Sequence, residues 1–124
     1  MVDLNYLKDI NDAYGHDVGD MAIIKLVSMI CETFTLSPVY RVGGDEFVVI
    51  CRGKDFIRIS YLISVFKTKV AESSNGVETH DGEHISAAIG YSLFDKTKDK
   101  GVCDVFKRAD KAMYENKREI KEGK

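Results

Sequence analysis

The sequence predicts an α+β domain with a ferredoxin-like, split βαβ core, in which helices pack on an antiparallel central sheet. Two observations lead to this fold class. The chain has 124 residues, which is long enough for one hydrophobic core and too short for two domains. The spacing of its apolar residues changes along the chain in the order strand, helix, strand, hairpin strand, helix, strand and helix.

The composition excludes several classes of partner. With 18 basic and 20 acidic residues the net charge is close to zero, so we expect no nucleic-acid partner and no direct membrane contact. The three cysteines, Cys31, Cys51 and Cys103, lie in apolar runs, and we expect them to be reduced core residues. No signal peptide or membrane span is recognised, which favours a cytoplasmic location, although a longer parent protein could be membrane-tethered.

The first third of the chain contains a strand end, a loop and a helix. Residues 1–5 are apolar and then acidic, like the last residues of a strand whose beginning is absent, so we expect an N-terminally truncated domain. A loop is predicted over residues 11–20, which tolerate turns. A helix is predicted from about residue 19 to 34, with Asp17 or Asp20 as its cap. Its apolar residues recur at helical spacing: Ile23, Leu26, Val27, Ile30 and Phe34.

A β-hairpin carrying two acids is predicted next. Pro38 ends the helical segment, and residues 39–42 and 47–51 read as two strands, the second apolar enough to be buried on both faces. Gly43 and Gly44 can adopt positive φ and so form a two-residue turn. Asp45 and Glu46 follow at the tip, the one place where neighbouring side chains could serve a single site. Alternatively, this stretch is only a solvated turn.

The second half repeats the alternation. A helix is predicted over residues 55–72, then a break at 73–76 and a strand at 84–93, whose small residues allow a helix or ligand to approach closely. The inward stripe of that helix is Phe56, Ile59, Leu62, Ile63, Phe66 and Val70. A last helix over residues 102–119 is expected to bury Val105, Phe106, Ala109, Ala112 and Met113. Lys117 and Lys121 lie one turn apart near its end.

This topology can bring Asp3 beside the hairpin tip. Carboxylates at one sheet edge are what a two-metal phosphoryl-transfer site needs, because bound Mg²⁺ neutralises phosphates and activates a hydroxyl. The alternative for Asp3 is a strand-end acid without a special role.

Five ordered blocks then stand out, covering nearly the whole chain. They are residues 3–12 (DLNYLKDIND), 15–20 (GHDVGD), 41–47 (RVGGDEF), 86–90 (SAAIG) and 109–117 (ADKAMYENK). Together they resemble the successive motifs of the GGDEF domain, the diguanylate cyclase family, and residues 1–124 would form one such domain. A lone Gly-Gly-Asp-Glu-Phe would be a much weaker signal.

The resemblance implies a fold similar to the palm of class III nucleotide cyclases, and an enzyme that condenses two GTP into cyclic di-GMP with release of pyrophosphate. The 3′-hydroxyl of each GTP would attack the α-phosphate of the other across a homodimer. By motif, Asp3 and the Leu4 carbonyl would bind Mg²⁺, two ions per site with Mn²⁺ as the alternative metal. Asp45 would be a ligand and general base, and Glu46 a further acid at the metal.

The resemblance also assigns the two ends of GTP. Guanine presents two neighbouring N–H donors, which a carboxylate can select. That carboxylate would be Asp20, with Asn11 supplying its amide and His16 close by. A helix cap, a turn former and a structural histidine are the respective alternatives.

The phosphates would be bound by lysines and backbone amides. Lysine meets phosphate as a point charge. The groups implied are Lys8, the backbone N–H groups around Tyr6 and Leu7, and Lys117 and Lys121. For the two C-terminal lysines the alternative is a favourable interaction with the helix C-terminus.

Three departures from the family pattern carry expectations. Residues 34–37 (FTLS) replace the inhibitory Arg-x-x-Asp, so no inhibitory site is expected. Lys121 replaces an arginine and Ile120 a glycine, so the grip on phosphate should be weaker. Most of the first strand is absent, which should leave Asp3 on a frayed chain end. No sensory or coiled-coil segment is recognised that would bring two domains together, so we expect the isolated domain to be mostly monomeric and nearly inactive. The rival function is a non-catalytic GTP-binding or protein-interaction module, against which the intact acids argue.

Overall fold

The computed structural model describes residues 1–74 and 81–122. The elements in chain order are β1 (Val2–Leu4), α1 (Leu7–Tyr14), α2 (His16–Thr33), β2 (Val39–Arg41), β3 (Glu46–Val49), α3 (Gly53–Ile57), α4 (Ile59–Ser74), β4 (Ala87–Ile89) and α5 (Val102–Glu122). The strands form one sheet in the order β2-β3-β1-β4, with every neighbouring pair antiparallel. This order is that of a split βαβ core, so the predicted α+β fold is confirmed.

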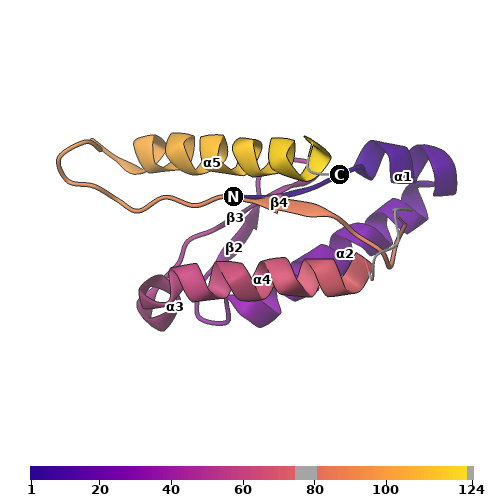
Figure 1. The fold of residues 1–124 in the computed structure, drawn as a ribbon, viewed down its shortest axis with the longest axis horizontal. Helices are drawn as coiled ribbons and strands as arrows, with labels where there is room; N and C mark the ends of the chain where they lie inside the picture. Colours follow the sequence, from indigo (N-terminus) through magenta and orange to yellow (C-terminus); the bar gives the residue numbers. More distant parts are fainter. Residues whose placement is uncertain (75–80, 123–124) are drawn as a thin grey trace.

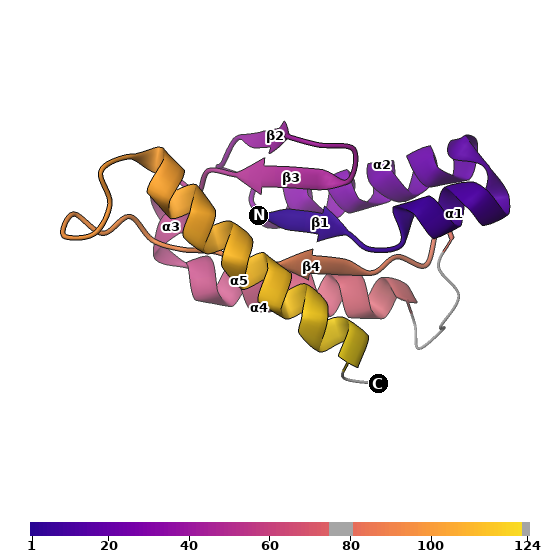
Figure 2. The same ribbon diagram turned by 90° about the horizontal axis from the view of Figure 1, so that it is seen from above.

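The sheet separates two layers of helices. Figure 1 shows α2 and α4 on one face of the sheet and α5 on the other, and Figure 2 shows α5 crossing over the strands. Successive strand residues point to opposite faces, so Val2 and Leu4 join the larger core while Met1 joins the smaller one. The larger core includes Leu26 and Ile30 of α2 and Leu62 and Phe66 of α4. The smaller core includes Ala88, Ala109 and Met113.

The prediction of close packing near β4 is confirmed at Gly90. A β-carbon there would stand 2.0 Å from the backbone nitrogen of Met113, so α5 can approach only a glycine at this point. The Asn116 side chain strengthens the contact by accepting a hydrogen bond of 3.0 Å from the Ile89 N–H. This packing holds α5 against β4, an edge strand of the sheet.

The expected frayed end is not found. β1 lies between β3 and β4, and the Met1 amino group donates a hydrogen bond of 3.0 Å to the Gly90 carbonyl. Met1 and Asp3 are buried against α5. Pairing on both edges therefore holds Asp3 on a central strand.

The predicted loop at residues 11–20 is wrong. Residues 7–14 and 16–33 are helical, and only Gly15, with φ 93°, interrupts them. Ile10 is buried and α1 packs on α2, so tertiary burial outweighs the turn preference of the polar residues. The cap prediction is also wrong, because Gly15 is the N-cap of α2 and Asp17 lies in its first turn.

The hairpin tip differs from a two-residue turn. Neither Gly43 nor Gly44 has a positive φ. The Val42 N–H donates to the Glu46 carbonyl at 3.0 Å, and the Arg41 guanidinium donates to the carbonyls of Gly43 (3.2 Å) and Gly44 (2.5 Å). The tip is thus a wider loop that Arg41 holds together. The return strand is shorter than expected, and only its Phe47 is fully buried.

Several other element boundaries shift. The helix expected over residues 55–72 is two helices, α3 and α4, separated at Arg58, and Phe56 is exposed. β4 is only three residues long, and residues 75–76 of the predicted break lie outside the described part. In α5, Ala109 and Met113 are buried whereas Phe106 is exposed.

Only one of the three cysteines packs against the core as expected. Cys31 of α2 and Cys103 of α5 are exposed, whereas Cys51, which follows β3, is half-buried and packs against the larger core. None of the three is in a disulfide. Among the described helices, none combines the length and apolarity needed to cross a membrane.

Candidate functional site

The site is built where β1 ends beside the tip of the β2–β3 hairpin. Asp3 and Glu46 are direct cross-strand partners, so their side chains share one face of the sheet. The Leu4 N–H donates a hydrogen bond of 2.9 Å to the Asp45 carbonyl, which places Asp45 beside the end of β1. Asp3 therefore meets the adjacent acids Asp45 and Glu46, more than forty positions later in the sequence, at one end of the strands, on the side covered by α5.

Asp3 is the buried member of this group. It is 4% exposed, and Lys117 of α5 donates a hydrogen bond of 2.7 Å from Nζ to its Oδ2. Burial raises the pKa of Asp3; the Lys117 bond opposes this shift, and the charges of Asp45 and Glu46 add to it. Burial works against the charged form of Lys117, but the bond to Asp3 and the nearby acids outweigh it and raise the Lys117 pKa. The group therefore has a surplus of negative charge.

The donor set fits a hard cation that shares its ligands with a phosphate chain. Asp3 Oδ1 is buried and has no hydrogen-bond partner among the described residues. Carboxylate and carbonyl oxygens are the ligands that Mg²⁺ prefers, and Mg²⁺ usually binds through one or two carboxylates with substrate phosphates completing its shell. Within residues 1–74 and 81–122, no three His, Cys, Asp or Glu side chains already surround a common point.

The β1–α1 turn lies next to these acids. Tyr6 has a left-handed φ of 66° and immediately precedes α1, whose N-terminal residues Leu7 and Lys8 were the other predicted phosphate groups. Lys121 Nζ lies 5.6 Å from the centre of the Tyr6 ring, while Lys8 is exposed. Lys117 and Lys121 of α5 therefore lie along the turn, one near Asp3 and the other over Tyr6.

The predicted guanine residues lie where α1 meets α2. A β-carbon on Gly19 would stand 1.8 Å from Asn11 Oδ1, so the Asn11 amide packs directly against the Gly19 backbone. Asp20 is the next residue and is exposed, as is His16 at the start of α2. The structure thus brings Asn11 close to the helical turn that carries Asp20, whereas the exposed His16 forms no hydrogen bond with Asn11 or Asp20.

Comparison with known proteins decides the family. The model of the family "Diguanylate cyclase, GGDEF domain" matches residues 1–123. The chain belongs to the GGDEF domain family. Diguanylate cyclase A of Treponema denticola is 30% identical over 122 residues, covering 94% of this chain and 31% of that protein. Diguanylate cyclase DgcZ of Escherichia coli is 29% identical over 125 residues, covering 94% of this chain and 39% of that protein. The chain spans about a third of the length of these curated relatives.

Solved structures agree with this GGDEF assignment. The active GGEEF domain of a diguanylate cyclase from Vibrio cholerae has a TM-score of 0.76 at 28% identity, covering 94% of this chain and 73% of that one. The GGDEF domain of DgcB from Caulobacter crescentus, solved in complex with c-di-GMP, has a TM-score of 0.72 at 24% identity. It covers 94% of this chain and 69% of that one, and at this identity the likeness concerns the fold alone.

In this GGDEF domain, residues 34–37 are anchored by one buried side chain and by hydrogen bonds to Asp55. Phe34 is 2% exposed and belongs to the larger core. The buried Asp55 carboxylate accepts hydrogen bonds from the Leu36 N–H (2.8 Å) and the Ser37 hydroxyl (2.7 Å). The role of Asp55 was missed, because nothing in the sequence pairs an acid in one helix with a loop eighteen residues earlier.

Asn5 is a second residue that sequence reasoning missed. It is fully buried directly after β1. In a strand, residues two apart lie on the same face, so the position of Asn5 two residues after Asp3 was the signal that could have placed it near the acids. The chain turns towards α1 at the next residue, so a polar side chain buried here is unusual.

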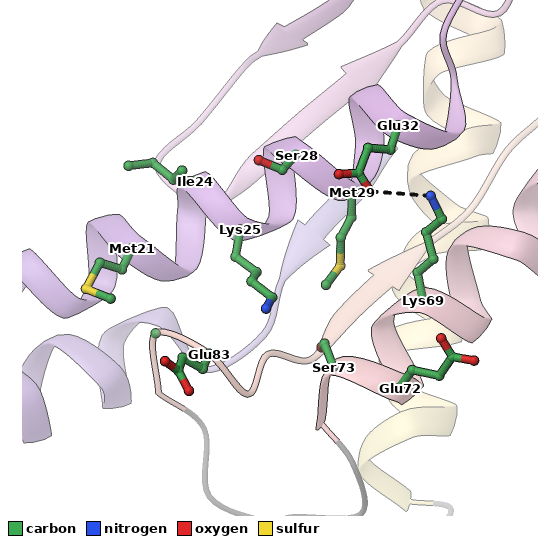
Figure 3. Close-up of a pocket in the computed structure, with 11 residues that line it drawn as sticks. Met21, Ile24, Lys25, Ser28, Met29, Glu32, Lys69, Glu72, Ser73 and Glu83 are labelled. Atoms are coloured by element: carbon green, nitrogen blue, oxygen red, sulfur yellow. Dashed lines mark hydrogen bonds and ion pairs between the residues drawn. The ribbon is translucent and has the colours of Figure 1, made fainter.

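A pocket of about 770 Å³ lies away from this site (Figure 3). It is lined by residues of α2 and α4 and by residues 82–83, and it contains none of the predicted site residues. Its charges are mixed, with Lys69 of α4 forming an ion pair of 3.5 Å with Glu32 of α2. The hollow is therefore separate from the cluster formed by Asp3, Asp45 and Glu46.

Proposed function

We propose that this GGDEF domain is the catalytic domain of a diguanylate cyclase that condenses two GTP into cyclic di-GMP and releases pyrophosphate. The observation that carries the proposal is the register of Asp3 opposite Glu46, with Asp45 at the adjoining tip. Acids that converge beside a lysine and a helix N-terminus suit a nucleoside triphosphate bound with a divalent cation.

The three acids would serve as metal ligands, and Asp45 would also act as the general base. Asp3, the Leu4 carbonyl, Asp45 and Glu46 would hold Mg²⁺, two ions per site with Mn²⁺ as a substitute. When bound, the metal supplies charge neutralisation of the phosphates and lowers the pKa of the attacking hydroxyl. Asp45 is half-buried at the tip and would accept the proton of the ribose 3′-hydroxyl.

Lys117 would exchange its partner when substrate binds. In the structure it neutralises part of the charge of Asp3. With a cation held at Asp3, the Lys117 ammonium group would be available to donate to a phosphate oxygen nearby. Lys121, Lys8 and the backbone N–H groups around Tyr6 and Leu7 would bind the remaining phosphate oxygens.

The guanine base of GTP would be recognised at the α1–α2 junction. Asp20 would accept from the two donors on the guanine edge, with the Asn11 amide beside it and His16 at the rim. Each domain would hold one GTP, so two copies facing each other would complete the reaction. Initial rates should then rise more steeply than linearly with protein concentration.

The direct test is product formation. The protein is incubated with GTP and Mg²⁺, and cyclic di-GMP and pyrophosphate are measured by mass spectrometry and a coupled assay. We expect product from the wild type fused to a dimeric coiled coil, and a loss of at least about 100-fold in the same fusion of Asp45→Asn, because a general base contributes that much. Circular dichroism should show that Asp45→Asn stays folded, since a half-buried tip residue adds little to the core.

A contrary result is equally clear. If the wild type, fused to a dimeric coiled coil, binds GTP with Mg²⁺ and forms no pyrophosphate, the cyclase proposal is wrong. The domain would then be a non-catalytic GTP-binding module.

A further inference from the structure

Asn5 is a buried amide at the junction between the acids and α1. It is 0% exposed, follows β1 directly and precedes Tyr6, which has φ 66°. A left-handed φ at a non-glycine residue costs free energy and persists only where its surroundings hold it. The residues on either side of Asn5 are the ones whose backbone groups we assign to metal and phosphate.

Hydrogen bonds fix this junction from both sides. On one edge, the Leu4 N–H donates to the Asp45 carbonyl at 2.9 Å. On the other, Asn5 bonds twice to Ser86, its N–H to the Ser86 carbonyl at 2.8 Å and its Nδ2 to the Ser86 hydroxyl at 3.0 Å. Because a hydroxyl can donate or accept, the second bond survives either orientation of the amide.

The rest of the Asn5 amide is not used by the fold. Asn5 Oδ1 is buried without a hydrogen-bond partner among the described residues, a condition it shares only with Asp3 Oδ1 two residues earlier. Buried polar atoms are normally bonded, and one left over calls for an explanation other than packing. An apolar side chain of similar size would fill the space without this cost.

We propose that Asn5 is a positioning residue of the site, which through Ser86 holds the Leu4 carbonyl and the Tyr6–Leu7 backbone in place for a divalent cation and a triphosphate. The inference rests on the proposed function, since it assigns Asn5 to the same metal and phosphate groups. Groups that orient metal ligands without touching the metal typically change metal affinity or activity by about 10- to 100-fold when removed.

The test compares metal binding with stability in the full chain. Mn²⁺ is titrated into wild type, Asn5→Ala, Ser86→Ala and Asn5→Asp, and free Mn²⁺ is followed by electron paramagnetic resonance. Thermal unfolding is measured on the same samples. The matched control is Thr33→Val, which removes another buried hydrogen bond, from Thr33 Oγ1 to the Met29 carbonyl at 2.8 Å, at the end of α2 far along the chain from this junction.

We expect Asn5→Ala and Ser86→Ala to raise the Mn²⁺ concentration at half-saturation about tenfold, while Thr33→Val lowers the unfolding temperature and leaves Mn²⁺ binding unchanged. Asn5→Asp should restore affinity relative to Asn5→Ala, because the Ser86 hydroxyl can donate to a carboxylate. With GTP, kcat should fall more than KM rises. If Asn5→Ala does not fold, Ser86→Ala, at a half-buried residue, decides the question.

The inference is overturned if both variants lose stability like Thr33→Val while Mn²⁺ half-saturation stays within about twofold of the wild type. This outcome differs from failure of the proposed function, in which wild type binds Mn²⁺ and GTP and forms no cyclic di-GMP.

Discussion

Lys117 of α5 and Asp3 of β1, separated by 114 positions in the sequence, form a hydrogen-bonded ion pair of 2.7 Å. The pair joins the last helix to the central strand at the place where the hairpin acids also converge. Asp3 is a buried carboxylate with one oxygen paired and the other without a hydrogen-bond partner among the described residues. Such a charge is only partly compensated, and a further cation would stabilise it. This contact therefore links the stability of the domain to its proposed metal site.

Removing one partner of this pair should destabilise the domain. Lys117→Met keeps most of the apolar stem and leaves the Asp3 charge uncompensated. We expect a loss of about 1–3 kcal/mol in the free energy of unfolding, below the value for fully buried pairs because the Lys117 side chain is 24% exposed. Urea denaturation measures this loss, with Lys111→Met on the exposed side of the same helix as control. The double variant Asp3→Asn/Lys117→Met should recover part of the loss, and equal stability of single and double variants would contradict the argument.

Gly19→Ala should disturb the proposed guanine site. The new methyl group would collide with Asn11 Oδ1 at 1.8 Å, so the Asn11 amide must move. Because a displacement of about 1 Å can cost up to about 100-fold, we expect the KM for GTP to rise at least about tenfold. Steady-state kinetics measures this, with Gly101→Ala as control because a β-carbon there meets nothing within 4 Å. An unchanged KM in Gly19→Ala would place guanine elsewhere.

Cyclic di-GMP should not bind at residues 34–37. Phe34 is buried in the core, and Leu36 and Ser37 are bonded to Asp55, so the segment offers neither a guanidinium nor a free acid. Titration with cyclic di-GMP, followed by amide chemical shifts, should leave these residues unperturbed and the initial rate unchanged. Addition of GTP serves as the positive control. Saturable shifts confined to residues 34–37 would refute the prediction.

Low pH should reduce the stability that Asp99 contributes in the loop before α5. Hydrogen bonds from the Arg108 guanidinium hold the Asp99 pKa below its usual value of 3.8, despite the opposing effect of burial. A carboxylate with a lowered folded-state pKa contributes stability that is complete above pH 3.8 and is lost as the pH falls through the folded-state value. The stability difference between wild type and Asp99→Asn should thus be constant near neutral pH and shrink in acid.

Chemical denaturation at a series of pH values measures this difference. Asp12→Asn, on the exposed side of α1, provides the control and should show no comparable pH dependence. A difference that grows as the pH falls would have the wrong sign for this mechanism.

The amino-acid sequence by itself determined the fold class and the acidic hairpin, because both follow from local patterns. Apolar spacing marked α2, α4 and α5, and the glycine pair before Asp45 marked the tip. The residues proposed to bind guanine and phosphate were identified from short sequence motifs in a fixed order, and such motifs are also local.

Only the tertiary structure decided what those patterns contact. Residues 11–20 are mostly polar and turn-tolerant, yet all of them except Gly15 are helical, because burial of Ile10 and packing of α1 on α2 outweigh local preference. The Asp3–Lys117 pair, the Asn5–Ser86 bonds and the Asp55 contacts join residues distant in the chain. Such pairings depend on register and helix placement, for which no local pattern exists, because the free energy that selects them is the burial of the whole core.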